Sequence, residues 1–342
     1  MKKIRLGKTE LMVTKTSMGC LPVQRCDLEE GTKLLRAAYE AGINFFDTAN
    51  AYTDSEKKLG LALHDVRENV IIATKSMART KDEILAHIEN SLKMLQTDYI
   101  DLFQFHLVPE VPDPNDPNGH YAGALEAKKR GWIRHIGVTT HRVNVAEEAI
   151  ASGLFETLQF PFSYISADRD LALAAKCREA DMGFIAMKGL AGGLLTNARA
   201  CHAFMKQHEN VVPIWGIQRM EELDQWLAAD REDPDLDDEL AAVIRADREQ
   251  LAGEFCRSCG YCMPCPVDIE ISNSARMNML LRRSPWRQYY TPQWREKMER
   301  INDCLECRQC AEKCPYQLDT PNILKYMLKD WQEFYEEHKA EL

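Results

Sequence analysis

Short apolar runs alternate with longer amphipathic stretches through the first two-thirds of the chain. The runs are rich in β-branched and aromatic residues, which favour buried strands. The stretches between them, such as Leu28–Ala41 and Lys81–Leu95, repeat apolar residues at helical spacing. The pattern therefore predicts strands that alternate with helices. The expected strands are Lys15–Gly19, Asn44–Asp47, Val70–Thr74, Tyr99–Phe105, Ile133–Val138, Thr157–Phe160, Gly183–Met187 and Val211–Trp215.

Eight strand–helix units in about 215 residues fit a (β/α)8 TIM barrel, a fold that begins at about 200 residues. A doubly wound sheet is the alternative, but its phosphate-binding pattern G-x-G-x-x-G does not occur in the sequence. The opening segment Ile4–Val13, with Gly7 at a turn, predicts a hairpin that caps the bottom of the barrel.

An acidic, proline-containing segment at residues 230–239 predicts the boundary between two domains. We expect the barrel to occupy residues 1–235 and a second domain to occupy residues 236–342. Helical spacing returns beyond the boundary, so the second domain is expected to be mainly helical. Its predicted helices are Glu239–Leu251, Ser274–Arg283, Pro292–Ile301 and Thr320–His338.

Two cysteine runs lie in this second domain. The second run reads C-x2-C-x2-C-x3-C-P. Bacterial ferredoxins hold [4Fe–4S] clusters with this spacing, and the fourth cysteine binds the other cluster. The first run has the same form with a shorter last gap. The spacing predicts two clusters with crossed ligation: Cys256, Cys259, Cys262 and Cys314 on one, and Cys304, Cys307, Cys310 and Cys265 on the other.

Structural zinc is the next interpretation, because two C-x2-C pairs can form a four-cysteine site. Zinc gives no reason for a third evenly spaced cysteine and a Cys-Pro in both runs. Disulfides rank last, since they need an oxidising compartment and the N-terminal sequence has no apolar core of a signal peptide. No apolar stretch is long enough to span a membrane. Because iron–sulfur clusters of this kind need a reducing interior, we expect a cytoplasmic protein.

The composition, 45% hydrophobic and 28% charged, is typical of a soluble globular protein. The net charge of −10 disfavours a nucleic-acid binder, which usually carries a basic face. Cys20, Cys26, Cys177 and Cys201 have no ligand spacing and are expected to be reduced thiols.

Four polar residues stand at the ends of successive predicted strands or in the adjacent loop. Asp47, Lys75 and His106 each end a strand, and Tyr52 follows Asp47 in the same loop. A lone histidine after an apolar run is more often a satisfied core residue, and a lone lysine usually reaches solvent. Four such residues in register are harder to assign to chance, because strand ends converge on the face where barrel active sites form.

Around these four residues the sequence resembles the aldo-keto reductase family. With the cysteine domain, the whole chain resembles the branch of that family that carries a C-terminal [4Fe–4S] dicluster domain. The resemblance implies a reductase of carbonyl compounds. It rests on Phe46-Asp47-Thr48-Ala49 with Tyr52, Ala73-Thr74-Lys75, Gln104-Phe105-His106, Ile136-Gly137-Val138-Thr139-Thr140, Gln159 and residues 183–195.

The residue types suit hydride chemistry, since hydride addition to a carbonyl leaves an alkoxide that needs a proton. A tyrosine with a pKa near 10 donates poorly at neutral pH. We expect the ammonium of Lys75 to depress the pKa of Tyr52, and Asp47 to fix the position of Lys75. We predict that Tyr52 is the acid, that Lys75 and Asp47 form the pair that adjusts the pKa of Tyr52, and that His106 orients the carbonyl.

The resemblance also implies contacts to NADP(H) or NAD(H). Thr139, Thr140 and Gln159 would meet the nicotinamide carboxamide, and glycines after the seventh strand would let the backbone approach a pyrophosphate. Arg219 is the expected partner of a 2′-phosphate, because its guanidinium suits phosphate. The expected cofactor residues are Thr139, Thr140, Gln159, Met187, Lys188, Gly189, Gly192, Gly193, Gly216, Gln218, Arg219 and Glu222.

The sequence departs from the family pattern after the seventh strand. Met187-Lys188-Gly189-Leu190 stands where the family has an aromatic residue followed by Ser-Pro-Leu, and Thr140 stands for the usual Asn. A flavin in the barrel mouth is therefore an alternative cofactor. It would also connect hydride transfer, which moves two electrons, with clusters that accept one each.

Three functions remain open. The first is reduction of a small-molecule aldehyde or ketone with NAD(P)H. The second is electron transfer, in which the clusters exchange electrons with a flavin or substrate and with a ferredoxin-like redox partner. The third is a redox sensor that does not use its barrel site. The four strand-end residues disfavour the sensor, because folding does not need them in register.

Overall fold

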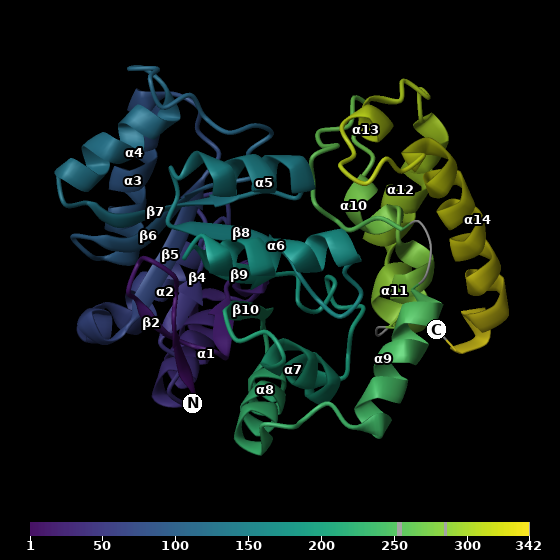
Figure 1. Cartoon of the computed structure of the whole chain (residues 1–342). Helices are drawn as coiled ribbons and strands as arrows, with labels where there is room; N and C mark the ends of the chain where they lie inside the picture. The colour runs from purple at the N-terminus through teal and green to yellow at the C-terminus, as the bar shows by residue number, and fades with distance from the viewer. Residues whose placement is uncertain (252–254, 284–285, 342) are drawn as a thin grey trace. The chain divides into compact units, whose positions relative to one another are not determined.

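The computed structural model describes residues 1–251, 255–283 and 286–341 (Figure 1). Contacts divide the chain into two compact units. The first comprises Met1–Gly189 and Asn197–Ile244, and the second comprises Leu190–Thr196 and the residues from Arg245 onward. The short segment Leu190–Thr196 thus lies in the barrel part of the sequence but belongs to the second unit.

The first unit contains a closed barrel of eight parallel strands, which confirms the predicted (β/α)8 fold (Figure 1). The strand order is β10-β3-β4-β5-β6-β7-β8-β9, so successive strands are neighbours. Every predicted strand is present, with its ends within two residues of the expectation. The strands are β3 Ser17–Gly19, β4 Phe45–Asp47, β5 Ile71–Ser76, β6 Ile100–Phe105, β7 Ile133–Thr139, β8 Thr157–Pro161, β9 Gly183–Met187 and β10 Val211–Gly216.

Helices follow the strands and surround the barrel, and polar residues fix where several of them begin. Asp27 accepts a hydrogen bond from Glu30 N at the start of α1, and Thr80 and Glu83 form a capping box at the start of α3. The helices of this unit are α1 Leu28–Glu40, α2 Ser55–Leu63, α3 Lys81–Leu95, α4 His120–Lys129, α5 Val143–Ser152, α6 Asp168–Glu179, α7 Ala198–Lys206 and α8 Met220–Glu232.

The predicted N-terminal hairpin is present as β1 (Lys3–Arg5) and β2 (Met12–Thr14), which pair antiparallel. Leu6 and Val13 join the core cluster of the barrel strands, so the hairpin seals the interior with apolar side chains. Gly7 has φ +53, and a Cβ on it would lie 2.2 Å from Gly183 N. The turn therefore requires glycine.

The regular elements described in the second unit are helices, in line with the predicted mainly helical domain. The predicted helix Ser274–Arg283 is wrong in its start and continuity. Glu270 caps the amide of Asn273, so a helix begins earlier, and the chain turns at Ala275 before the next one. The helices are α9 Asp238–Gln250, which begins in the first unit, α10 Ile271–Ser274, α11 Met277–Arg283, α12 Pro292–Glu299, α13 Gln309–Glu312 and α14 Thr320–His338.

Aromatic packing holds α14 within the second unit. The rings of Tyr290 and Trp331 stack with centroids 4.9 Å apart, and Trp331 Nε1 donates to Tyr289 O at 3.1 Å. The helix has the bounds predicted from the sequence. None of the helices that the structure describes is long and apolar enough to cross a membrane.

Candidate functional site

Asp47 and Lys75 form a buried ion pair at neighbouring strands of the barrel. Asp47 is the last residue of β4, and Lys75 is the penultimate residue of β5. Lys75 Nζ lies 2.6 Å from Asp47 Oδ2 and also donates to Thr48 O at 2.5 Å. Lys75 is 1% exposed and Asp47 is 3% exposed. Because both residues stand within strands and not in a loop, the backbone of the barrel fixes the position of the ion pair.

Two amide side chains complete the surroundings of Asp47. Gln104 Nε2 donates to Asp47 Oδ1 at 3.2 Å and to Gln159 Oε1 at 2.8 Å. Gln159 Nε2 lies 3.4 Å from Asp47 Oδ2. Gln159 was expected to contact the nicotinamide. In this structure its side-chain amide lies beside the carboxylate of Asp47. Sequence reasoning missed Gln104, although the pairing of β5 with β6 places it beside Lys75.

Tyr52 and His106 lie next to this pair, so the structure brings the four predicted residues together. Lys75 Nζ is 5.3 Å from the ring centroid of Tyr52. The rings of Tyr52 and His106 meet edge to face with centroids 5.8 Å apart. Tyr52 is half-buried, while His106 is 7% exposed. The arrangement places a phenol, an ammonium and an imidazole around one point.

Burial and charge act in opposite directions on Tyr52. Desolvation raises the pKa of its phenol, while the ammonium of Lys75 acts to lower that pKa. Lys75 thus acts on the pKa of Tyr52 in the expected direction, while burial, the larger effect, makes the net direction upward. The carboxylate of Asp47 holds the pKa of Lys75 above its ordinary value despite burial. Lys75 is therefore charged at neutral pH and Tyr52 keeps its proton.

His106 is a neutral imidazole. Burial, with the charges of Lys75 and Arg79, lowers its pKa to about 3. Among the described residues its Nδ1 has no hydrogen-bond partner. A second buried histidine, His141, contributes a further neutral ring, since burial and the charge of Lys188 lower its pKa. Nothing in the residue pattern around His141 identified it beforehand.

The two threonines expected at the carboxamide are buried at the end of β7, where their hydroxyls hold the next loop. Thr139 Oγ1 accepts from Leu107 N at 2.8 Å. Thr140 Oγ1 donates to Val108 O at 3.1 Å. In this structure both hydroxyls thus fix the segment that follows His106.

The glycines after β9 differ in what surrounds them. Gly189 leaves room for the indole ring of Trp215, because a Cβ at this position would lie 2.7 Å from that ring. A Cβ on Gly192 would lie 2.4 Å from Arg276 Nη1, whereas a Cβ on Gly193 would meet open space. Of these three glycines, Gly193 alone leaves room at its α-carbon among the residues that the structure describes.

Met187 ends β9, Lys188 follows it directly, and both residues are half-buried. Met187 O accepts a hydrogen bond from Phe162 N at 3.0 Å. Lys188 has φ +57, a left-handed backbone that is uncommon outside glycine. The departure from the family pattern at these two residues therefore coincides with a turn in the chain.

Residues expected at the adenosine end of the cofactor gather at the start of α8. Arg219 Nη2 pairs with Glu222 Oε1 at 2.7 Å, and the arginine side chain is 61% exposed. Gln218 N donates to Glu222 Oε2 at 2.9 Å. Pro22 lies close by, since a Cβ on Gly216 would be 3.2 Å from its ring. The guanidinium remains accessible although it is paired.

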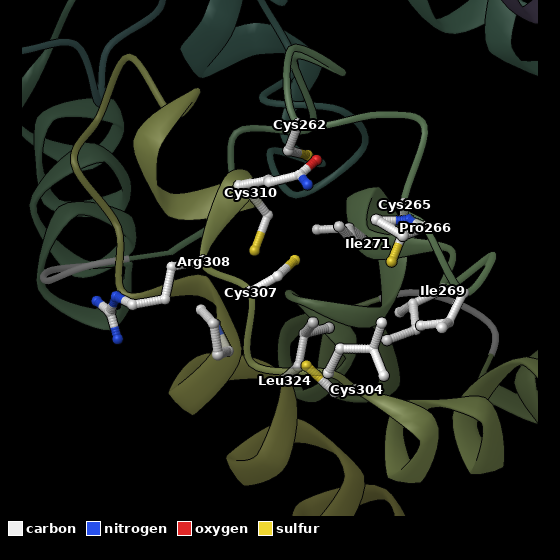
Figure 2. Close-up of a pocket in the computed structure, with 14 residues that line it drawn as sticks. Cys262, Cys265, Pro266, Ile269, Ile271, Cys304, Cys307, Arg308, Cys310 and Leu324 are labelled. Carbon is white, nitrogen blue, oxygen red and sulfur yellow. The ribbon is translucent and has the colours of Figure 1, made fainter.

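The cysteines of both runs line two pockets in the second unit, the first of which is shown in Figure 2. Each pocket contains the four cysteines expected on one cluster and one cysteine expected on the other. Cys262 and Cys310 line both pockets. The first pocket is lined by Cys262, Cys265, Cys304, Cys307 and Cys310, and the second by Cys256, Cys259, Cys262, Cys310 and Cys314.

The two pockets differ in exposure. Cys256 is buried, while Cys307 and the neighbouring Leu305 are exposed, Leu305 at 65%. In the part of the chain that the structure describes, no three His, Cys, Asp or Glu side chains converge as they do around a single metal ion. A cubane cluster takes one thiolate at each of four irons, so its ligand sulfurs stand apart.

Comparisons with known proteins agree with the barrel. The chain is 29% identical over 210 residues to the oxidoreductase YqkF of Bacillus subtilis, which covers 57% of this chain and 67% of the relative. It is 32% identical over 185 residues to the aldo-keto reductase YhdN of the same organism, with coverages of 50% and 55%. For the second relative the match thus spans just over half of its length.

Solved structures match the barrel at low sequence identity. The aldo-keto reductase AKR11C1 of Bacillus halodurans, in its holo form, has a TM-score of 0.63 at 24% identity and covers 72% of this chain and 96% of its own. An aldo-keto reductase of Klebsiella pneumoniae in complex with NADPH has a TM-score of 0.62 at 22% identity, with coverages of 72% and 95%. These likenesses show the fold.

Family models match both parts of the sequence. A 4Fe-4S dicluster domain matches residues 255–319, which contain all cysteines of the two runs. The aldo/keto reductase family matches residues 16–228, more than half of the chain. The chain is thus an oxidoreductase of the aldo/keto reductase family that carries a C-terminal 4Fe-4S domain.

Proposed function

We propose that the barrel reduces an aldehyde or ketone to an alcohol with NADPH or NADH. The observation that carries the proposal is the convergence of Tyr52 and His106 on the buried pair of Lys75 and Asp47. A protein that only binds its ligand needs no proton donor beside a fixed ammonium. The family to which the chain belongs supports the same reaction class.

When bound, the nicotinamide supplies a hydride to the carbonyl carbon. The residues of the chain manage the proton and the position of the substrate. Tyr52 keeps its proton at neutral pH, because burial holds its pKa high, and gives it to the carbonyl oxygen as charge develops there. Lys75 then stabilises the phenolate, since its charge favours the ionised form of Tyr52.

His106 orients the carbonyl oxygen as a hydrogen-bond donor. Its pKa near 3 keeps the imidazole neutral, so one ring nitrogen carries a proton and the other does not. Asp47 acts through Lys75, and the amides of Gln104 and Gln159 hold the carboxylate in place. These two amides are therefore positioning groups for the ion pair.

For the cofactor, we propose that residues at the ends of β7 to β10 hold the dinucleotide. Gly193 offers an open backbone position for a pyrophosphate, and Arg219 offers an exposed guanidinium for a 2′-phosphate. NADP(H)-bound relatives of the same fold support a nicotinamide cofactor. The remaining proposed contacts are Thr139, Thr140, Gln159, Met187, Lys188, Gly189, Gly192, Gly216, Gln218 and Glu222.

For the second unit we propose two [4Fe–4S] clusters with crossed ligation. Cys256, Cys259 and Cys262 with Cys314 would hold one, and Cys304, Cys307 and Cys310 with Cys265 the other. The linings of the two pockets support this division, because each contains one complete proposed set. Clusters of this kind need reducing conditions, so we place the protein in the cytoplasm.

Electron transfer is the second candidate function, favoured by the exposure of Cys307 and its neighbours. In that case the clusters would exchange electrons with a ferredoxin-like partner and with a flavin or substrate in the barrel. To separate electron transfer from carbonyl reduction without electron coupling, NADPH or NADH is added anaerobically and the visible absorbance of the clusters is measured. Bleaching supports electron coupling. Unchanged absorbance, with carbonyl reduction that survives cluster removal, rejects it.

The proposed function itself is tested by NADPH oxidation with a panel of aldehydes and ketones. The cluster-loaded wild type should consume NADPH in proportion to the alcohol formed, and the Tyr52→Phe variant should bind NADPH without consuming it. If no carbonyl compound supports turnover although NADPH binds, the proposal fails.

A further inference from the structure

Each of the two cysteine pockets has an arginine among the residues that line it. Arg257 stands directly after Cys256 and lines the second pocket. Arg308 stands directly after Cys307 and lines the first pocket. Both pockets lie wholly within the second unit, so each arginine can be compared with the cysteines of its own pocket. The two arginines differ in how their charge is held.

Two aromatic rings hold the guanidinium of Arg257. Its Cζ lies 3.7 Å from the ring centroid of Phe255 and 5.8 Å from that of Tyr316. A positive charge over an aromatic face is attracted to it. Phe255 is 2% exposed and precedes Cys256, while Tyr316 follows Cys314 and lines the same pocket. Rings from both cysteine runs thus fix the half-buried Arg257 at the second pocket.

The charge of Arg308 is placed differently. Its side chain is 57% exposed, and Nη2 lies 3.3 Å from Asp319 Oδ1. Figure 2 shows the guanidinium of Arg308 directed away from the sulfurs of Cys307 and Cys310. A carboxylate therefore balances the charge of Arg308, and solvent screens it.

The position of a fixed positive charge matters to a cluster, because the cluster gains one negative charge when it accepts an electron. No bond forms or breaks in this step. Burial opposes the added charge, and Cys256 is buried whereas Cys307 is exposed. A cation held beside the buried thiolates opposes this effect, since its attraction to the cluster grows on reduction. Net charge and solvent exposure are among the factors that set the potential of an iron–sulfur cluster.

We propose that Arg257 raises the reduction potential of the cluster that Cys256, Cys259 and Cys262 help to bind. The guanidinium offsets the cost of burial, so that this cluster accepts an electron from a one-electron donor such as a ferredoxin-like protein. The inference rests on the proposed clusters of the second unit. It does not depend on crossed ligation, because Arg257 follows Cys256 whichever cysteine is the fourth ligand.

The experiment is a redox titration of the full, cluster-loaded chain with dithionite, followed by electron paramagnetic resonance. In Arg257→Gln, reduction of one cluster should be at least about tenfold less favourable than in wild type, a fall of about 59 mV in its potential. The potential of the other cluster should stay at its wild-type value. Unchanged potentials in this variant overturn the inference, as does an equal fall of both.

Arg257→Lys is the matched variant that keeps the charge. A lysine ammonium also interacts with aromatic rings, so this variant should recover most of the potential that Arg257→Gln loses. Equal potentials in the Lys and Gln variants would show that the charge is not the cause. Arg257→Met, which keeps an apolar contact with Phe255, repeats the neutral substitution if Arg257→Gln binds less iron than wild type.

Arg308→Met is the control at the first pocket. It also removes one arginine beside a cysteine, but that arginine is exposed and paired with Asp319. Neither potential should fall as far as in Arg257→Gln. A fall as large would mean that any positive charge near the cysteines has this effect, and would overturn the specific role of Arg257.

Iron content separates this inference from the proposed two-cluster function. Two clusters require about eight irons per chain, four for each. If wild type binds only about four, the two-cluster proposal fails. The potential of the remaining cluster should still fall in Arg257→Gln, and an unchanged value would overturn the inference.

Discussion

Lys75 Nζ lies 2.6 Å from Asp47 Oδ2, and neither side chain has appreciable contact with solvent. Two charges inside a barrel are costly to desolvate, and their mutual attraction offsets that cost only when the geometry is good. Here Gln104, Gln159 and the carbonyl of Thr48 add hydrogen bonds to the pair. These hydrogen bonds satisfy the buried charges and fix the position of the ion pair.

Removal of one partner should be strongly destabilising. Lys75→Met leaves the carboxylate of Asp47 buried without a counter-charge, and we expect a loss of about 3–5 kcal/mol in the free energy of unfolding. Urea denaturation of the cluster-loaded protein measures it. Arg36→Met breaks exposed ion pairs with Glu40 and Asp65 and should change the free energy of unfolding far less, because solvent screens exposed charges. Equal losses in the two variants would contradict the account of the buried pair.

Tyr52→Phe removes the proton donor while it keeps the ring. We expect carbonyl reduction to fall by about 10²–10⁴-fold, the usual contribution of a general acid. NADPH affinity and the visible spectrum of the clusters should not change. Steady-state kinetics and equilibrium titration check the two parts. Retention of full activity would show that another group supplies the proton.

His106 should make the protein less stable as pH falls. Its pKa is about 3 in the folded protein and about 6.5 in the unfolded chain, so between these values the unfolded chain binds one more proton. The free energy of unfolding therefore decreases as pH drops through this window, by up to about 1.4 kcal/mol per pH unit from this residue. The free energy of unfolding recovers this contribution of His106 as pH rises to about 6.5.

The His106→Gln variant should lose that share of the pH dependence. Urea denaturation between about pH 5 and pH 7, where the wild type and the variant are compared at each pH, measures the difference. Other buried histidines such as His141 remain in both proteins, so their contribution cancels. Parallel curves for the two proteins would contradict the low pKa of His106.

Crossed ligation predicts which variants resemble one another. Cys265→Ser should alter the same cluster as Cys307→Ser, although Cys265 belongs to the first run. Cys314→Ser should in turn resemble Cys259→Ser. Electron paramagnetic resonance of the reduced proteins and iron content give the comparison. If Cys265→Ser resembles Cys259→Ser, each run binds its own cluster.

Local patterns in the sequence were sufficient to predict the barrel and the convergence of Asp47, Tyr52, Lys75 and His106. Strand periodicity located β3 to β10, and a closed parallel barrel brings the ends of its strands to one face. Residues at those ends, such as Asp47 and His106, therefore had to converge. The cysteine runs could also be recognised from the sequence alone, because the ligands of an iron–sulfur cluster repeat at short spacing.

Features that depend on contacts between distant parts of the chain were not predictable in this way. Gly192 was expected to make room for a pyrophosphate, but its neighbour is Arg276, far along the sequence. The balance of burial and charge on Tyr52 depends on packing, which no pattern of residue types reports. The cap by Glu270 begins α10 earlier than the helical pattern predicts, and the chain breaks between α10 and α11 at Ala275.

Deuterium transfer tests the central claim most directly. NADPH carrying deuterium at both C4 positions is supplied to the cluster-loaded protein with a carbonyl substrate in ordinary water, and the alcohol is analysed by mass spectrometry. Direct hydride transfer predicts one deuterium on the carbinol carbon of each alcohol formed. Alcohol that carries only solvent hydrogen would show that no hydride passes directly from NADPH to the substrate, and would contradict the proposed reductase mechanism.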